Sequence, residues 1–192
     1  MTEPYDDIAA SVLAAPARLG PVRLVTVDGP AGSGKTTFAA GLVAALVETA
    51  VVVHMDDLYE GWHDIEDCWP RVEEWLLAPL GAGRPARVRH YDWPAGRWGE
   101  DWHDVGLPVV LVLEGVGAGR RAVADETTLA VWVEAPRDLG LARGVERDGE
   151  ALRGEWLRWQ AEEADHFARE GTRERAQLLV DGTRTGTVRW VG

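Results

Sequence analysis

Residues 29–36 of the chain are Gly-Pro-Ala-Gly-Ser-Gly-Lys-Thr. They match the pattern G-x-x-x-x-G-K-[ST], in which a glycine-rich loop curls around a phosphate so that its N–H groups point inward. A helix that begins at the end of such a loop adds the positive end of its dipole. The pattern therefore predicts a phosphate-binding loop for a nucleoside triphosphate.

Each residue type in this loop has a task set by the chemistry of phosphate. Lys35 is expected to reach the β- and γ-phosphates and the Thr36 hydroxyl to ligate Mg²⁺, so ATP and Mg²⁺ are the expected cofactors. Lys35 is also the chain's only lysine among 20 basic residues. We expect nucleotide contacts from Gly29, Ala31, Gly32, Ser33, Gly34, Lys35, Thr36 and Thr37.

The segments around the loop alternate between short apolar strands and helices. Strands are predicted at 23–27, 51–54, 87–91, 109–113, 129–133 and 178–180, with a further pairing segment at 188–191. Helices are predicted at 6–15, 36–49, 70–77, 137–148 and 155–169. Continuous apolar strands that alternate with helices indicate a parallel sheet covered on both faces. The expected fold is therefore α/β, a three-layer P-loop NTPase fold with a central parallel sheet.

Composition limits the kind of protein this can be. A chain of 192 residues is expected to form a single domain, residues 1–192. The net charge of −12 argues against nucleic acid and anionic membrane as partners, because both need a basic surface. The acidic N-terminus and the lack of a long apolar run predict a cytoplasmic protein. Cys68, the sole cysteine, is expected to be a packed small residue.

Acidic residues follow three of the predicted strands. Asp28, Asp56 and Glu114 each come directly after an apolar run, and Asp57 follows Asp56. Ligands of open parallel sheets bind beyond the carboxyl ends of the strands, so these acids are expected to face the phosphate loop. There they can hold Mg²⁺ or take a proton from an attacking hydroxyl. We expect functional roles for Asp56 and Glu114, and a role in fixing the loop for Asp28.

One region has an unusual composition. Residues 61–104 hold six of the ten tryptophans together with many charged and turn-forming residues. Such a composition suits loops and short helices around a ligand pocket. Packing of the tryptophans over an irregular core is an equally good interpretation for any one of them.

The chain resembles the uridine kinase and phosphoribulokinase branch of the P-loop kinases. The resemblance rests on V-D-G-P-A-G-S-G-K-T-T at 27–37, M-D-D-L-Y at 55–59, Y-D-W at 91–93, V-L-E-G-V at 112–116 and R-G-V-E-R-D at 143–148. The last of these is similar to that family's arginine-rich lid helix, which places a lid at about 137–154. The motifs occur in the family's order and span most of the chain.

The resemblance implies a role for each matching residue. Asp56 would be the general base, acting with Lys35, and Glu114 would hold Mg²⁺ together with Thr36. The lid arginines Arg143 and Arg147 would close over the phosphates as further catalytic residues. The implied contacts to the acceptor are Asp56, Tyr59, Tyr91, Asp92 and Trp93.

The chain departs from the family pattern in the lid and in the acceptor region. Gly144 stands where the family has a second arginine, and Trp93 stands where it has phenylalanine. The expected activity is transfer of the γ-phosphate of ATP to a hydroxyl of a small molecule, most often a nucleoside such as uridine or cytidine in this family. A sugar, a pantothenate-like alcohol or a nucleoside monophosphate is an alternative acceptor.

Other classes of nucleotide-binding protein fit less well. GTPase switches use an N-K-x-D segment, and this chain has no asparagine and no second lysine. Motor ATPases usually end a hydrophobic run in D-E, whereas the run here ends in Glu114-Gly115. A nucleotide-binding ATPase without transferase activity stays an alternative. The charged helix at 155–169 could face solvent or a second copy, so a homo-oligomer is compatible with the sequence.

Overall fold

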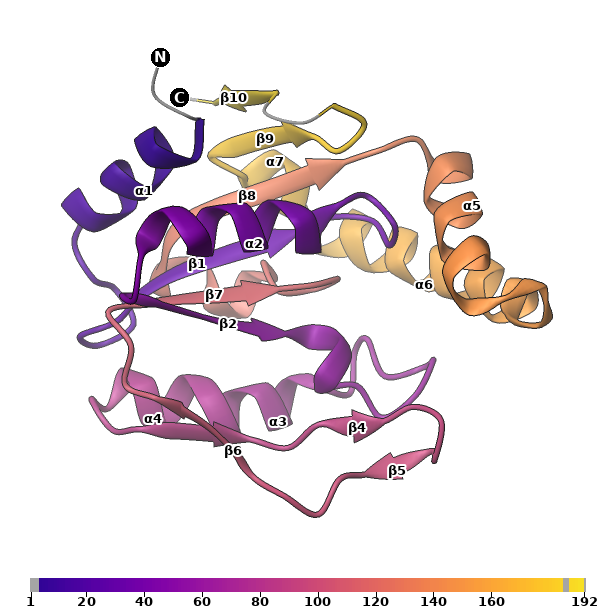
Figure 1. Cartoon of the computed structure of the whole chain (residues 1–192), viewed down its shortest axis with the longest axis horizontal. Helices are drawn as coiled ribbons and strands as arrows, with labels where there is room; N and C mark the ends of the chain where they lie inside the picture. The colour runs from indigo at the N-terminus through magenta and orange to yellow at the C-terminus, as the bar shows by residue number, and fades with distance from the viewer. Residues whose placement is uncertain (1–3, 185–186, 192) are drawn as a thin grey trace.

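The computed structural model describes residues 4–184 and 187–191. Its centre is a six-stranded sheet in the order β10-β9-β8-β1-β7-β2 (Figure 1). The strands are β1 (Arg23–Asp28), β2 (Ala50–His54), β7 (Val110–Glu114), β8 (Thr127–Glu134), β9 (Leu178–Asp181) and β10 (Val188–Trp190). The pairings among the first five are parallel, and β10 runs antiparallel to β9. The predicted three-layer α/β architecture is confirmed.

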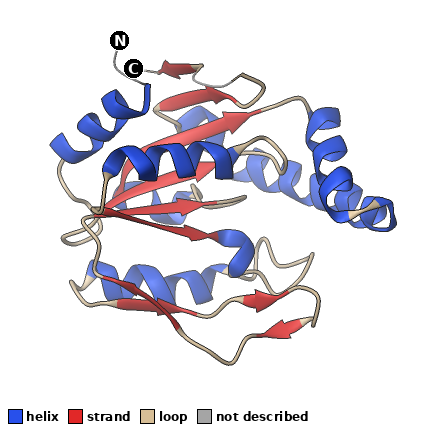
Figure 2. Cartoon of the chain, viewed as in Figure 1, coloured by secondary structure: helices blue, strands red, loops and turns tan. Residues whose placement is uncertain are grey.

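Helices cover both faces of the sheet (Figure 2). Helices α1 (Pro4–Ala14) and α2 (Lys35–Leu46) pack on one face, and α3 (Trp69–Val72), α4 (Ala78–Gly81) and α6 (Arg153–Glu170) pack on the other. Helix α5 (Arg137–Asp148) follows β8, and the short α7 (Thr172–Arg175) precedes β9. Among residues 4–184 and 187–191, no helix is long and apolar enough to cross a membrane.

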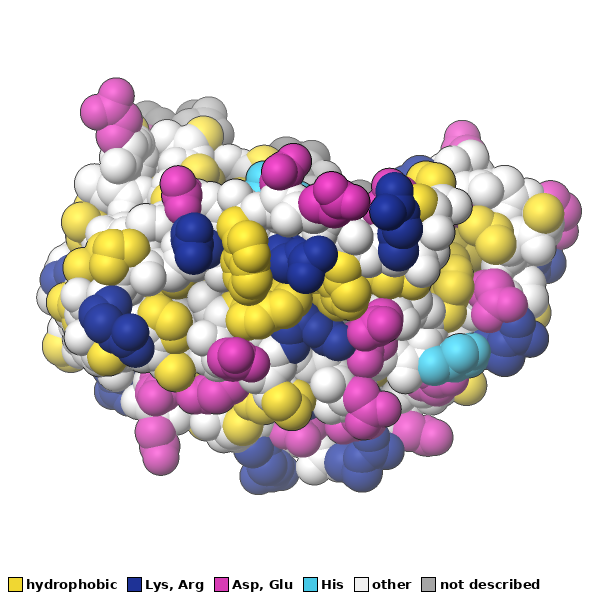
Figure 3. Space-filling view, turned by 90° about the horizontal axis from the view of Figure 1, so that it is seen from below, with side chains coloured by type: hydrophobic (Ala, Val, Ile, Leu, Met, Phe, Trp, Pro, Cys, Tyr) yellow, Lys and Arg dark blue, Asp and Glu magenta, His cyan; other side chains and the backbone are white. Residues whose placement is uncertain are grey.

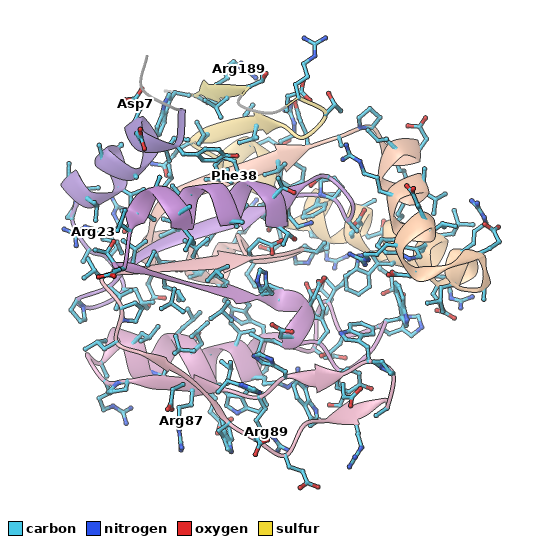
Figure 4. The ribbon with its side chains drawn as sticks, viewed as in Figure 1. Asp7, Arg23, Phe38, Arg87, Arg89 and Arg189 are labelled. Atoms are coloured by element: carbon cyan, nitrogen blue, oxygen red, sulfur yellow. The ribbon has the colours of Figure 1, made fainter. Side chains whose placement is uncertain are left out.

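Strand alternation divides the core into two clusters. Val25 and Val27 of β1 point to the side of α1 and α2, where Phe38 projects from α2 (Figure 4). Leu24 points to the opposite side, where Leu76 and Leu77 belong to the cluster. The apolar strands are therefore buried on both faces, as their composition predicted.

Two predicted boundaries are wrong. The helix predicted at 36–49 ends at Leu46, because Val47 and Glu48 adopt left-handed backbone angles with φ of 35° and 45°. The helix predicted at 70–77 is part of a longer run from Trp69 to Gly81, in which Glu73–Leu77 forms a wider π-helical turn. Pro79 lacks an N–H to donate to the preceding turn, which accounts for the irregularity there.

The strand predicted at 87–91 is also corrected. The chain forms β3 (Ala86–Val88), which pairs with β6 (His103–Gly106), and then β4 (Tyr91–Asp92), which pairs with β5 (Arg97–Trp98). The break lies at Arg89, whose guanidinium donates to the Gly99 carbonyl at 2.8 Å. Arg87 and Arg89 project outward at this end of the molecule (Figure 4), where apolar and arginine side chains alternate on the surface (Figure 3).

Candidate active site

The carboxyl ends of the central strands meet at one edge of the sheet, beside the loop that follows β1 and near α5 and α6 (Figure 1). In the register of the sheet, Glu114 lies opposite Val27 of β1 and His54 of β2. A cavity of about 1070 Å³ lies at this edge. Its lining includes the phosphate loop, the acids after β2 and β7, and side chains of α5 and α6.

The phosphate loop has a conformation that requires its glycines. Gly29 has φ of 144°, and a Cβ atom there would lie 2.1 Å from the Val133 carbonyl oxygen. Gly32 has φ of 74°, and a Cβ atom there would lie 2.5 Å from the carbonyl oxygen of Gly140 on α5. Both positions therefore exclude a side chain by backbone angle and by space.

Asp28 fixes this loop through hydrogen bonds from backbone N–H groups. Its Oδ1 accepts the N–H groups of Gly29 at 2.7 Å and Gly117 at 3.0 Å, and its Oδ2 accepts that of Gly119 at 2.9 Å. Burial raises the pKa of Asp28, while the N–H donors of Gly119 and Gly29 and the charge of Lys35 oppose that rise. Asp28 thus joins the phosphate loop to the loop after β7, the fixing role expected from the sequence.

Lys35 and Thr36 lie at the start of α2. Lys35 is 7% exposed, and its ammonium donates to the Pro30 carbonyl at 3.0 Å. The Thr36 hydroxyl donates to Glu114 Oε2 at 3.3 Å. The same carboxylate oxygen lies 2.6 Å from His54 Nδ1, and this hydrogen bond is the main cause of the raised pKa of His54.

Thr36 and Glu114 together fit the donor set that a magnesium ion needs. Mg²⁺ is usually held by one or two protein oxygens together with substrate phosphates and water. A hydroxyl and a carboxylate 3.3 Å apart beside a phosphate loop meet that requirement. Among the described residues, no three or more His, Cys, Asp or Glu side chains cluster so that they could hold a metal ion by themselves.

Asp56 follows β2 in the 3-10 helix Met55–Asp57 and lines the cavity. Its side chain is exposed to solvent within the cavity. The surrounding protein atoms still disfavour its charged form, and this desolvation raises the pKa of Asp56. Glu114 and Asp57 add to this rise, and Lys35 and Arg147 oppose it. A carboxyl with a raised pKa close to cations is well suited to accept a proton.

Both predicted lid arginines line the cavity, and each already has partners. Arg143 donates to the Gly32 carbonyl at 2.9 Å and to the Gly182 carbonyl at 3.3 Å. Arg147 makes two hydrogen bonds to Asp148, at 2.7 and 3.0 Å, and its guanidinium lies 5.5 Å from the centre of the Trp156 ring. In this arrangement Arg143 is bonded to the phosphate loop, whereas Arg147 lies beside Asp148 and Trp156.

The structure explains why α5 has glycine at position 144. A Cβ atom on Gly144 would lie 2.6 Å from Cε2 of Trp156, which packs flat against α5 from α6. A larger residue such as arginine cannot fit there without moving the indole. The departure from the lid pattern is therefore coupled to the tryptophan that faces it.

Aromatic side chains form one wall of the cavity. Trp62 makes edge contacts with the rings of Trp93, Trp156 and Trp159, at centroid distances of 5.5, 5.6 and 6.0 Å. Tyr59 packs its ring against Trp159 at 5.2 Å, and its hydroxyl donates to the Val116 carbonyl. All five rings line the cavity, so this wall is apolar.

The predicted acceptor residues are separated by the structure. Tyr59 and Trp93 line the cavity, and Trp93 Nε1 donates to the Asp56 carbonyl at 2.9 Å. In the described part of the chain, Tyr91 and Asp92 are outside the cavity lining. Tyr91 packs against Trp98, and Asp92 accepts the N–H of Ala95 in a turn, so both support the hairpin that carries Trp93.

Sequence reasoning missed the contribution of α6. Its buried face carries Trp156, Trp159, Gln160, Glu163 and His166, at helical spacing. Glu163 is 3% exposed and accepts the N–H of Ala31 in the phosphate loop at 2.8 Å. Trp156, Trp159 and Glu163 follow one another at helical spacing, which indicates a shared face of the helix but not what that face contacts. Cys68 is buried and its pKa is raised to about 12 by burial, as its packed role predicted.

The chain is similar to known kinases in sequence and in fold. No family model matches it. A curated uridine kinase from Halobacterium salinarum is 29% identical over 138 residues, which cover 65% of this chain. The match spans 61% of that relative's length.

Two solved structures share the fold over nearly their full length. A possible uridine kinase from Bacillus stearothermophilus has a TM-score of 0.68 at 19% identity, covering 93% of this chain and 97% of its own. A candidate fructose transport system kinase from Silicibacter sp. TM1040 has a TM-score of 0.58 at 22% identity, covering 94% and 98%. The fold is that of the P-loop kinases. The resemblance to uridine kinases drawn from the sequence is confirmed.

Proposed function

We propose that this protein is a kinase that transfers the γ-phosphate of ATP to a hydroxyl group of an uncharged small molecule, with a nucleoside such as uridine or cytidine as the leading acceptor. The observation that carries the proposal is the position of Asp56. Its carboxyl lines one cavity together with Lys35, Thr36 and Glu114, and its pKa is raised. A phosphate loop and a base that share a cavity are what phosphoryl transfer to an alcohol requires.

The nucleotide part of the site follows from the loop. The N–H groups of residues 32–36 would hold the β-phosphate, and Lys35 would turn from the Pro30 carbonyl to the β- and γ-phosphates. Thr36 and Glu114 would hold Mg²⁺, which neutralises charge on the phosphates. Arg143 would stay on the loop, and Arg147 would lie toward the transferring group.

The transfer itself needs little covalent chemistry from the protein. The acceptor hydroxyl oxygen forms a bond to the γ-phosphorus as the bond to the β–γ bridging oxygen breaks, and ADP leaves. Asp56 takes the proton of the hydroxyl. Lys35 and Arg147 stabilise the charge on the equatorial oxygens, and the cavity orients the two substrates.

The wall around Asp56 supports an uncharged, flat acceptor. Five aromatic rings line this part of the cavity, and the half-buried Trp62 and Trp93 offer apolar ring surface to a planar acceptor. The carboxylates beside this wall are Asp56, Asp57 and Asp148, and Arg147 next to them is already paired with Asp148. A nucleoside monophosphate or a pantothenate-like acid would bring a further negative charge to this wall. A sugar is the second candidate, because the fold is shared with a candidate fructose transport system kinase.

The proposal extends to the organisation of the chain. Residues 1–192 would act as one kinase domain, and the segment 137–154 would act as its lid. This segment comprises α5, the 3-10 helix Glu150–Leu152 and the start of α6. The contacts of Arg143 to both the phosphate loop and Gly182 support such a role, since they link α5 to two sides of the nucleotide site.

The test is an acceptor panel. The protein is incubated with Mg·ATP and, separately, uridine, cytidine, adenosine, ribose, fructose, uridine monophosphate or pantothenate. ADP release is measured and the phosphorylated product is identified by mass. We expect a nucleoside to raise turnover above hydrolysis without acceptor, and the two anionic acceptors to fail. If no acceptor raises turnover, the protein is an ATPase or a binding module and the kinase proposal is wrong.

A further inference from the structure

Glu163 is a buried carboxylate that the proposed transfer does not use. It lies on α6, 132 positions along the chain from Ala31, whose N–H it accepts at 2.8 Å. Ala31 lines the cavity, but its N–H points to Glu163. This hydrogen bond can therefore persist when a nucleotide occupies the loop.

Other contacts attach the α5–α6 pair to the same loop. Gly140 of α5 lies so close to the loop that a Cβ atom on it would be 2.5 Å from the Ala31 carbonyl oxygen. Arg143 donates to the Gly32 carbonyl at 2.9 Å. The two helices are joined where Gln160 donates to the Arg137 carbonyl at 2.9 Å. Short contacts thus connect the phosphate loop to α5 and α6. In one of them an ionisable carboxylate, Glu163, accepts a hydrogen bond from a loop N–H.

We propose that Glu163 is a positioning residue that couples the phosphate loop to α6, and that binding of a nucleoside triphosphate is accompanied by uptake of a proton at its carboxyl. The proposal rests on the proposed nucleotide binding, but it does not depend on which acceptor is used. It assigns to α6 a role in sensing whether the loop holds phosphate.

The charges around Glu163 support this behaviour. Lys35 of α2 and Arg137 of α5 face it and favour its ionised form, and Asp28 of β1 disfavours that form. Burial outweighs these charges and raises the pKa of Glu163 to about 7. On its own helix, His166 lies one turn further and is bonded to Glu66 at 2.7 Å. Glu163 is therefore partly protonated near neutral pH before any ligand binds.

A bound triphosphate changes this balance in one direction. Its negative charge would lie against the loop that Glu163 contacts, and it would draw the Lys35 ammonium into direct contact with phosphate. Both changes disfavour the carboxylate, so a proton moves from the solvent to Glu163. A rise of one pKa unit from about 7 corresponds to uptake of about 0.5 proton at pH 7.5, and to about tenfold weaker ATP binding above both pKa values than below both.

The experiment is calorimetric titration of the full chain with Mg·ATP at pH 7.5. Repeating it in buffers of different ionisation enthalpy gives the number of protons taken up. Wild type is compared with Glu163→Gln, which keeps an oxygen to accept the Ala31 N–H but cannot titrate. The matched control is Glu162→Gln, since Glu162 is on the same helix and pairs with His63 away from the loop. The dissociation constant is also measured from pH 6 to pH 9.

We expect wild type and Glu162→Gln to take up about 0.5 proton more than Glu163→Gln, whose affinity should also lack the decline above pH 7. Equal proton uptake in all three proteins would overturn the proposal, because a purely structural role for Glu163 does not move protons. Absence of any binding heat in wild type would remove both this inference and the proposed function. Binding without acceptor phosphorylation would leave the inference in place and remove only the kinase activity.

Discussion

Replacing Gly144 by alanine tests how the proposed lid helix is fitted to α6. The new Cβ atom would lie 2.6 Å from Cε2 of Trp156 and 2.7 Å from two further atoms of the same ring. Carbon atoms in contact normally lie about 3.5–4 Å apart, so helix or indole must move. The indole is 4% exposed and its Nε1 donates to Asp148 at 3.1 Å, which limits its freedom to rotate.

The expected size of the effect follows from two opposing terms. Alanine in place of glycine within a helix contributes about 0.5–1 kcal/mol of stability. Overpacking of this kind costs about 1–3 kcal/mol. Gly154 on α6 provides the control, because it is exposed and no described heavy atom lies within 4 Å of a Cβ atom there. Gly154→Ala therefore carries the favourable term alone.

The measured quantity is the difference between the two variants in free energy of unfolding, obtained from urea titrations. We expect Gly144→Ala to be about 1–3 kcal/mol less stable than Gly154→Ala, which corresponds to about 6 °C in Tm at the middle of that range. In a Trp156→Leu background the cost of Gly144→Ala should disappear. The reasoning is refuted if Gly144→Ala is as stable as Gly154→Ala in the wild-type background.

Three further changes probe the site. Asp28→Asn leaves part of the N–H cage around residue 28 unpaired, so urea titration should show a loss of about 1–3 kcal/mol; an unchanged midpoint would contradict that role. Asp56→Asn should lower kcat about 10²–10⁴-fold while the Kd for Mg·ATP stays within about threefold; a parallel loss of affinity would instead assign Asp56 to the metal. Glu163 binds its proton more tightly when folded, with its pKa raised from 4.5 to about 7. Its contribution is therefore complete below about pH 4.5, and about 3 kcal/mol is lost as the pH rises through 7. Glu163→Gln should match wild type at low pH and exceed it at pH 8 in denaturant titrations, and parallel pH curves would exclude this.

The phosphate loop and the strand ends were predictable because their signals are local. Residues 29–36 carry the glycines that their backbone angles require, and Asp28 and Glu114 follow apolar runs that pair as neighbouring strands. The order of those strands makes the acids meet, and that follows from a general rule for parallel sheets.

The contacts of α6 could not be predicted in the same way. The bond from Ala31 to Glu163 joins residues 132 positions apart, and nothing local to either one specifies the other. The fit of Gly144 against Trp156 likewise depends on how two helices pack. Tyr91 and Asp92 match a family motif, yet the hairpin of β4 and β5 places them behind Trp93 rather than in the cavity lining.

The amide cage around Asp28 has a consequence for the kinetics of nucleotide capture. Because the carboxylate ties Gly29 to Gly117 and Gly119, the loop loses its conformational freedom when the chain folds rather than when ATP arrives. Little ordering remains to be done on encounter, so association should be a single fast step governed by diffusion and charge. The amide hydrogens of Gly29, Gly117 and Gly119 should accordingly exchange slowly with deuterated solvent even in the nucleotide-free protein.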